Sequence, residues 1–189
     1  MKTSAIGILM LALVQGCTTT ATSPSPYKQP DDSGTASVRF RVARAIQDGG
    51  VTLYNYGDES CAPSPHGRFI DSIGVDKAFV SRTNQSIGMI SPESYPKHLF
   101  VERRFIGSKP LVFSMIANAG GPGFFCHSTY KFSPVSGRLY EVAIDIVGYN
   151  NCHVRVHELI QTPSGIEYRG EATAKQLPKF CEPPTLFSW

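Results

Sequence analysis

The chain has 189 residues, of which 41% are hydrophobic and 17% are charged, and its formal net charge at pH 7 is +3. The part that follows the first 35 residues has a length that suits one domain. The charge is too small to indicate a nucleic-acid-binding protein, and the chain has no cluster of lysine and arginine that suggests one.

The first residues have the pattern of a bacterial export signal. Lys2 precedes an apolar stretch from Ala5 to Val14, which as a helix would rise about 15 Å, half of a bilayer core. A positive start before an apolar run of this length is typical of a secretory signal. The run ends in Leu-Val-Gln-Gly-Cys at residues 13–17 and resembles the lipobox of bacterial lipoproteins. That resemblance implies that Cys17 becomes the first mature residue, carries acyl chains such as palmitate and anchors the protein in a membrane.

The residues after Cys17 indicate a destination and a tether. Residue 18 is threonine rather than aspartate, which by analogy with enteric lipoproteins implies export to the outer membrane. The alternative is an ordinary secretory signal in which Cys17 stands by chance. Residues 18–35 read TTTATSPSPYKQPDDSGT, a composition too poor in large apolar side chains to fold. We therefore expect a signal peptide at 1–16, a lipidated cysteine with a flexible tether at 17–35, and a single domain at 36–189.

Strand-like patterns then recur with turn signals between them. Alternation in residues 36–44 points Arg39 and Arg41 outward, and in the later segments it places these residues on shared faces: Tyr140, Val142, Ile144 and Ile146 on one, and Cys152, Val154 and Val156 on another. No long stretch has the apolar spacing of a core helix. Residues 61–97 are the least readable part, in which residues 64–74 and 86–94 are candidate short strands joined by long loops. Seven to eight short strands predict an all-β fold, an antiparallel β-sandwich of immunoglobulin-like or transthyretin-like appearance. The seven clearer segments are residues 36–44, 51–58, 98–107, 110–120, 124–132, 138–148 and 152–160.

One segment of this region resembles a group of known proteins. From Phe124 to Cys152 the chain follows the pattern F-x-C…F-x-P-x-x-G-x-x-Y-E-V…C. This pattern resembles uncharacterised β-rich lipoproteins of proteobacterial envelopes. The resemblance implies an envelope location and brings no activity with it.

Four cysteines remain once Cys17 is set aside, and an even number in an oxidising compartment predicts disulfides. Alternation places Cys126 and Cys152 on the core side of their strands. We expect these two to pair near one end of a three-strand meander, which leaves Cys61 and Cys181 to hold the C-terminal tail. Alternate strands of a flat sheet lie about 9.6 Å apart, so the first pair requires a loop position or strong curvature.

The usual catalytic motifs are absent from the sequence. It contains neither a G-x-S-x-G elbow nor an S-x-x-K, HExxH or P-loop motif. Asp58, Glu59, Asp71 and Asp76 could supply paired carboxylates, but their spacing fixes no distance between them, and loop charge is the plainer interpretation. The sequence therefore predicts a protein that is not an enzyme and has no cofactor.

Histidine and arginine alternate along one predicted strand. His153, Arg155 and His157 share its outer face, and His127 is a candidate neighbour. Such a face could bind a small ligand or a metal ion, although a solvated sheet surface is the plainer interpretation, and no resident metal is predicted.

Together these patterns predict a non-catalytic, membrane-anchored envelope lipoprotein that acts as a protein-interaction or structural module. Its expected partners are the membrane, through Cys17, and another envelope protein. Leu186, Phe187 and Trp189 are expected to pack on the domain or on that partner. The alternative is a periplasmic lipoprotein that binds a small ligand or metal on the His153-Arg155-His157 face.

Overall fold

A computed structural model describes residues 25–31, 33–43, 49–74, 86–91, 99–118, 125–148 and 151–183. The predicted signal peptide, Cys17 and the aromatic C-terminal residues lie outside this part of the chain. The described residues form ten strands in two five-stranded sheets. None of them belongs to a helix long and apolar enough to cross a membrane.

The first sheet carries the predicted histidine and arginine stripe. Its neighbouring strands are antiparallel, except that β1 and β7 run parallel. In spatial order it consists of β4 (Phe100–Ile106), β1 (Thr35–Val42), β7 (Leu139–Gly148), β8 (Asn151–Thr162) and β9 (Gly165–Gly170).

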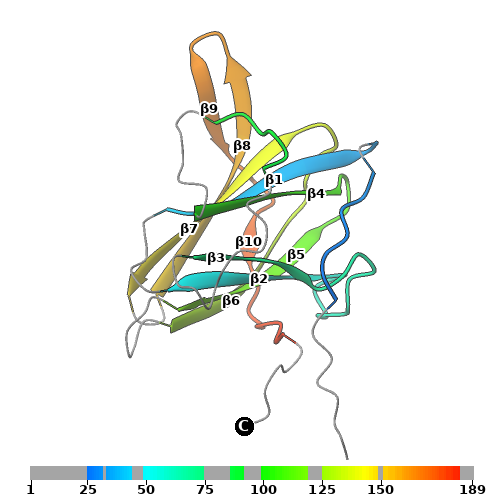
Figure 1. Cartoon of the computed structure of the whole chain (residues 1–189), viewed down its shortest axis with the longest axis vertical. Coiled ribbons are helices and arrows are strands. Elements are labelled where there is room, and N and C mark those ends of the chain that lie inside the picture. The colour runs from blue at the N-terminus through cyan, green and yellow to red at the C-terminus, as the bar shows by residue number, and fades with distance from the viewer. Residues whose placement is uncertain are drawn as a thin grey trace, which may run out of the picture.

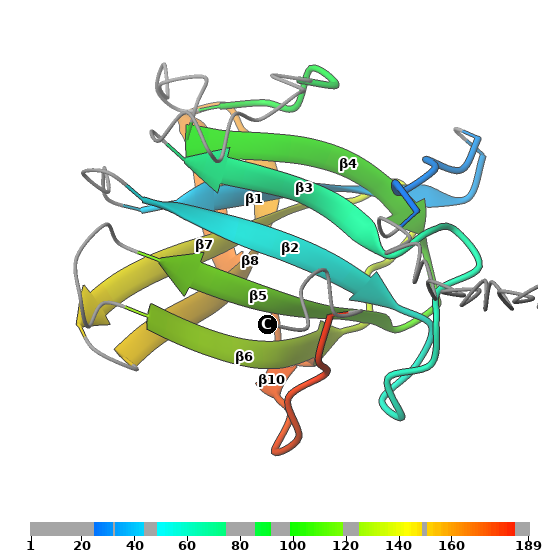
Figure 2. The same cartoon turned by 60° about the horizontal axis from the view of Figure 1, so that its bottom comes forward.

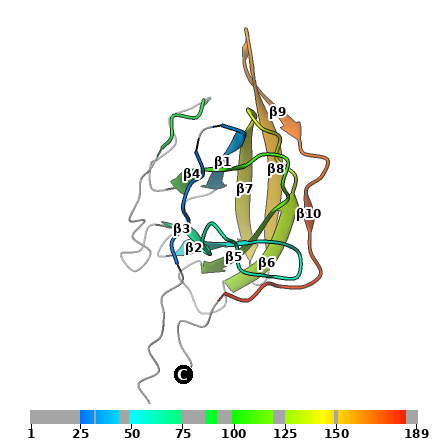
Figure 3. The ribbon, with the colours of Figure 1, turned by 90° about the vertical axis from the view of Figure 1, so that its right-hand side faces the viewer.

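The second sheet packs against the first and is antiparallel throughout. Figure 2 looks onto this sheet, with β1, β7 and β8 behind it, and Figure 3 shows the two layers from the side. In spatial order it consists of β10 (Lys175–Gln176), β6 (Phe125–Phe132), β5 (Leu111–Asn118), β2 (Gly50–Tyr56) and β3 (Phe69–Gly74).

The core lies between the sheets, where every second side chain of each strand points inward. Phe40 of β1 is fully buried and meets Phe113 of β5 edge-on, with ring centroids 5.3 Å apart. Val142 and Ile144 of β7 are also fully buried. Burying each such side chain contributes about 1.5–3 kcal/mol to the stability of the fold. The buried positions are those that the inward-outward alternation of the sequence predicts.

The all-β sandwich is confirmed, but three features of the strand arrangement differ from expectation. The structure has β9 and β10 in addition to the predicted strands. Of the two candidate strands between residues 61 and 97, the first contains β3, whereas residues 86–91 form no strand. The expected meander of residues 124–160 is wrong, because β6 belongs to the second sheet whereas β7 and β8 belong to the first. The connection after β6 crosses between the sheets, and there the Pro134 carbonyl accepts a hydrogen bond from the Ser108 amide at 2.7 Å.

This crossing explains the Cys126–Cys152 disulfide, which the structure contains as predicted. The Cα atoms are 6.2 Å apart, and both residues pack in the core between the sheets. The disulfide therefore joins the two layers of the sandwich. Neither a loop position nor a curved single sheet is needed to bring the cysteines together.

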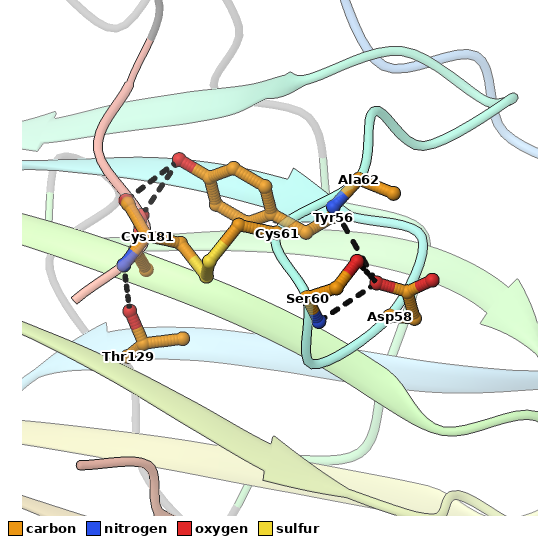
Figure 4. Close-up of a disulfide and its surroundings, with 8 residues drawn as sticks. Tyr56, Asp58, Ser60, Cys61, Ala62, Thr129 and Cys181 are labelled. Carbon is orange, nitrogen blue, oxygen red and sulfur yellow. Dashed lines mark hydrogen bonds between the residues drawn. A yellow bond between two sulfur atoms is a disulfide. The ribbon is translucent and has the colours of Figure 1, made fainter. Parts of the chain in front are cut away.

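The predicted Cys61–Cys181 disulfide is also present, with Cα atoms 5.3 Å apart. It lies on the outer face of the second sheet (Figure 4). The Tyr56 hydroxyl donates to the Cys181 carbonyl at 2.8 Å, and the Cys181 amide donates to the Thr129 hydroxyl at 2.8 Å. These contacts hold the C-terminal segment over a second apolar cluster on this face.

Residues 25–31 do not behave as the tether expected for 17–35. Pro26 forms a bridge with Phe69 of β3, and the ring of Tyr27 lies 4.8 Å from that of Phe105 in β4. The Tyr27 hydroxyl also donates to the Arg104 carbonyl at 2.7 Å. The Tyr27 ring and backbone hydrogen bonds, among them one from the Tyr27 amide to the Phe69 carbonyl at 2.7 Å, together hold this segment against the sandwich.

Candidate functional site

The predicted His153-Arg155-His157 stripe lies on the outer face of the first sheet. His153 and Arg155 are exposed, and His157 is half-buried. The inward side chains between them are Val154 and Val156, which contact the core. The alternation predicted for this strand is therefore correct.

His127 does not join that stripe. It belongs to β6 of the second sheet, next to the inward-pointing Cys126, so its side chain points away from the first sheet. Its ring lies 4.4 Å from Phe180 and 5.6 Å from Phe125. The expectation that His127 lies near His153 was wrong because it assumed that β6, β7 and β8 share one sheet.

A row of charged side chains crosses the outer face of the first sheet, which we call the charged row. The strand register aligns Glu102 of β4, Arg39 of β1, Glu141 of β7 and His157 of β8. Arg39 and Glu102 are each only 1% exposed. The sequence correctly predicts that Arg39 points out of the core, but not that it is buried there.

Arginine donors occupy both carboxylates of the charged row. Arg39 donates to one Glu102 oxygen from Nε at 3.0 Å and from Nη2 at 2.8 Å. Its Nη1 lies 3.5 Å from Glu141. Arg41 donates to the other Glu141 oxygen from Nε at 3.0 Å and from Nη2 at 2.8 Å. Hydrogen bonds between charged groups of this kind are stronger than those between neutral groups.

Residues 86–91 cover one end of the charged row. The Glu102 Oε2 atom accepts hydrogen bonds from the Ser86 hydroxyl and the Ile87 amide, each at 2.8 Å, and from the Met89 amide at 3.3 Å. Arg39 Nη2 donates to the carbonyls of Met89 and Ile90, at 3.2 and 3.0 Å. This segment therefore satisfies buried charges with backbone groups. It falls in the stretch that the sequence left unreadable, so nothing in its pattern could have revealed the contact.

The chemistry open to the charged row is limited by this pairing. General acid or base catalysis requires a carboxylate that a substrate can reach, whereas Glu102 and Glu141 are buried and bonded to arginine. Nor does the described part of the chain bring together three His, Cys, Asp or Glu side chains that could hold a metal ion. The row is therefore built to hold four strands and the covering segment together.

His157, at the end of the charged row, is the exception. Burial lowers its pKa, the charges of Arg155 and Arg41 lower it further, and Glu141 opposes them. The imidazole is thus held in its neutral form, with Tyr168 edge-on at 5.9 Å. Its Nδ1 atom is buried and has no hydrogen-bond partner, which leaves one ring nitrogen unused by the protein.

The predicted carboxylate candidates do not converge. Asp71, expected in a loop, lies buried in β3 and forms an ion pair with Arg103 of β4. Asp58 lies in the loop after β2, where hydrogen bonds from Ser60 lower its pKa, and Glu59 pairs with a lysine of β6. Asp76 lies outside the described residues.

The sequence reading missed the hairpin formed by β8 and β9. Leu139, the first residue of β7, pairs with Leu159, but β8 continues to Thr162. The rest of the hairpin projects beyond the sandwich (Figures 1 and 3). A turn signal at Pro163-Ser164, followed by alternating Ile166 and Tyr168, would have predicted it.

The projecting hairpin and the ends of the described chain lie at opposite ends of the molecule. Figures 1 and 3 show the start of the first described segment (dark blue) and the end of the last described segment (red) toward the end away from the hairpin.

Compared with known proteins, the chain matches no family model, no curated protein and no solved structure.

Proposed function

We propose that this protein is a non-catalytic lipoprotein of the bacterial cell envelope, anchored in the outer membrane through Cys17, that binds another protein. The observation that carries this proposal is that the start of the described chain and the β8–β9 hairpin lie at opposite ends of the sandwich (Figures 1 and 3). The first described segment, residues 25–31, begins eight residues after Cys17, a stretch that spans at most about 29 Å, and its start lies away from the β8–β9 hairpin (Figure 1). An anchor at Cys17 therefore keeps one end of the domain near the lipid and leaves the hairpin end available to a partner.

The non-catalytic part of the proposal is supported by the chemistry of the outer face. The buried carboxylates of the charged row are bonded to Arg39 and Arg41, and the exposed His153 and Arg155 lie on a sheet surface. A binding surface needs only shape and exposed contact groups. The β8–β9 hairpin offers both, because most of its residues from Gln161 to Gly170 are exposed.

The anchor is tested by replacing Cys17 with serine and separating membranes from soluble protein. The wild-type chain is expected in the membrane fraction, with a mature N-terminus at Cys17 whose mass includes acyl chains. Cys17→Ser is expected in the soluble fraction, whereas the matched control Thr19→Ser stays with the membrane. Membrane retention of Cys17→Ser would contradict the anchor.

A second candidate function is a small-ligand or metal-binding face formed by His153, Arg155 and His157, which the exposure of His153 and Arg155 favours. On this alternative the purified protein binds zinc or copper stoichiometrically, and the combined His153→Ala and His157→Ala changes abolish binding. His127→Ala is the matched control, because His127 lies on the opposite side of the sandwich. The absence of stoichiometric metal from the wild-type protein, or equal binding by the double variant, would rule out this metal site.

A further inference from the structure

We propose that the partner of the hairpin is a second copy of this chain, paired with it through the edges of their β9 strands. The two β9 strands run antiparallel about a two-fold axis at Tyr168. This inference specifies the partner of the proposed interaction module and so rests on that proposal.

The outer edge of β9 is open to a further strand. In the strand order of the first sheet, β9 is terminal and pairs with β8. The Glu171 amide donates to the Val156 carbonyl at 2.9 Å, so the alternation of an antiparallel ladder turns the backbone groups of Glu167 and Arg169 toward β8. Those of Ile166 and Gly170 then point away from β8, along the open edge. Among the residues that the structure describes, no strand lies on this side of β9.

The edge has some of the usual protections against pairing and lacks others. Natural edge strands are guarded by short length, charged side chains, especially lysine, proline or a bulge. β9 reads GIEYRG, with neither proline nor lysine, and its register with β8 runs without a shift from Gly165 to Gly170. The part of β8 beyond Leu159 pairs with β9 and no longer with β7, so the two strands form a two-stranded ribbon there. Such a ribbon is at best marginally stable in water. An added strand would stabilise it.

The charges of β9 are complementary to themselves under the proposed two-fold. Glu167 and Arg169 lie on the same face of the strand, 3.7 Å apart, and both are more than half exposed. A two-fold at Tyr168 places Glu167 of each copy directly opposite Arg169 of the other, on that same face. Cross-strand pairs of opposite charge stabilise a sheet, and like charges in the same positions destabilise it.

The backbone groups match under the same axis. Ile166 of one copy lies opposite Gly170 of the other, and these residues carry the outward-pointing groups. The pairing joins two first sheets into one of ten strands, with Gly170 opposite Ile166 at each end and the two Tyr168 residues opposite one another at the axis. Because the strands run antiparallel, the N-terminal ends of the two copies lie at opposite ends of the dimer, so the pairing joins copies anchored in two facing membranes and not neighbours in one membrane.

Charge reversal tests the pairing on the full-length protein in detergent micelles, where the direction of the two anchors imposes no constraint. Sedimentation equilibrium measures the dimer dissociation constant. Glu167→Arg and Arg169→Glu each place like charges opposite one another in both cross-strand pairs, and we expect each to weaken the dimer on the order of tenfold. The double reversal restores opposite charges and is expected to restore the wild-type constant.

A proline on the edge provides a second, independent test. Ile166→Pro removes an amide that points away from β8, so the hairpin keeps its own hydrogen bonds while the edge loses one. We expect this variant to be a folded monomer. Gln161→Arg, an exposed position on β8 away from the edge, is the matched control and is expected to dimerise normally.

Two results would overturn the inference. One is a wild-type protein that stays monomeric at all accessible concentrations. The other is a dimer whose dissociation constant is unchanged by Ile166→Pro and by both single reversals. Either result leaves the membrane anchoring of Cys17 untouched, because fractionation of cells measures that property separately.

Discussion

Replacing Arg39 with methionine is the change to which we expect the sandwich to be most sensitive. Arg39 is 1% exposed and donates to Glu102, to Glu141 and to two carbonyls of the covering segment. Methionine fills much of the same volume but supplies no donor. Two buried carboxylates then lose a cationic partner, and the Met89 and Ile90 carbonyls lose a hydrogen bond.

The expected size of the effect follows from this burial. Breaking a buried ion pair by removing one partner lowers the free energy of unfolding by about 3–5 kcal/mol. Domains of this kind are stable by about 5–15 kcal/mol in total, so the variant retains a fold but loses a large fraction of its stability. Arg138 provides the matched control, because its pair with Glu158 at 3.0 Å has an arginine that is 50% exposed. Arg138→Met should lower the stability by about 0–1 kcal/mol.

Urea unfolding followed by tryptophan and tyrosine fluorescence, with the disulfides intact, measures both variants. A double-mutant cycle of Arg39→Met with Glu102→Gln should give a coupling energy of about 1–3 kcal/mol. The reasoning fails if Arg39→Met and Arg138→Met lower the free energy of unfolding equally, because the charged row would then not be a buried structural network.

Two further predictions concern the disulfides and pH. The Cys61–Cys181 disulfide closes a loop of 120 residues, and the Cys126–Cys152 disulfide closes one of 26. Chain entropy predicts that removing the first lowers the free energy of unfolding by about 5 kcal/mol and removing the second lowers it by about 3.5 kcal/mol. Urea unfolding measures both, and the reverse order would refute the entropic account. The pKa of His157 is lower in the folded protein than in the unfolded chain, so the unfolded chain binds a proton more readily. The contribution of the neutral imidazole to stability is therefore present above pH 6.5 and is lost as the pH falls toward the folded-state pKa. His157→Asn should therefore lose less stability than wild type between pH 7.5 and 5.5, and an identical loss in both proteins would count against a buried neutral imidazole.

Local patterns in the sequence predicted the parts of the fold that depend on single strands. Alternation in β7 and β8 placed Val142, Ile144 and Val156 inward and His153 outward, and the structure agrees. The pairing of Cys126 with Cys152 was also predicted. These results depend on which way a side chain points, which the two-residue period of a strand determines.

The features that were missed depend on which strands become neighbours. The chain crosses between the sheets after β6, which separates His127 from His153, and no local pattern distinguishes this crossing from a hairpin. The burial of Arg39 depends on residues 86–91, whose contacts with the first sheet are long-range and leave no periodic signal. An outward-pointing arginine is ordinarily exposed, and only the covering segment makes this one buried.

Site-specific photocrosslinking in living cells tests the account most directly. A photoreactive residue replaces Ser164 at the tip of the β8–β9 hairpin, and in a separate variant it replaces His127 on the outer face of the other sheet. An anchored interaction module that binds through its hairpin predicts a reproducible protein adduct of defined mass from position 164 and none from position 127. An adduct from position 127 alone, or no adduct from either position, would contradict it.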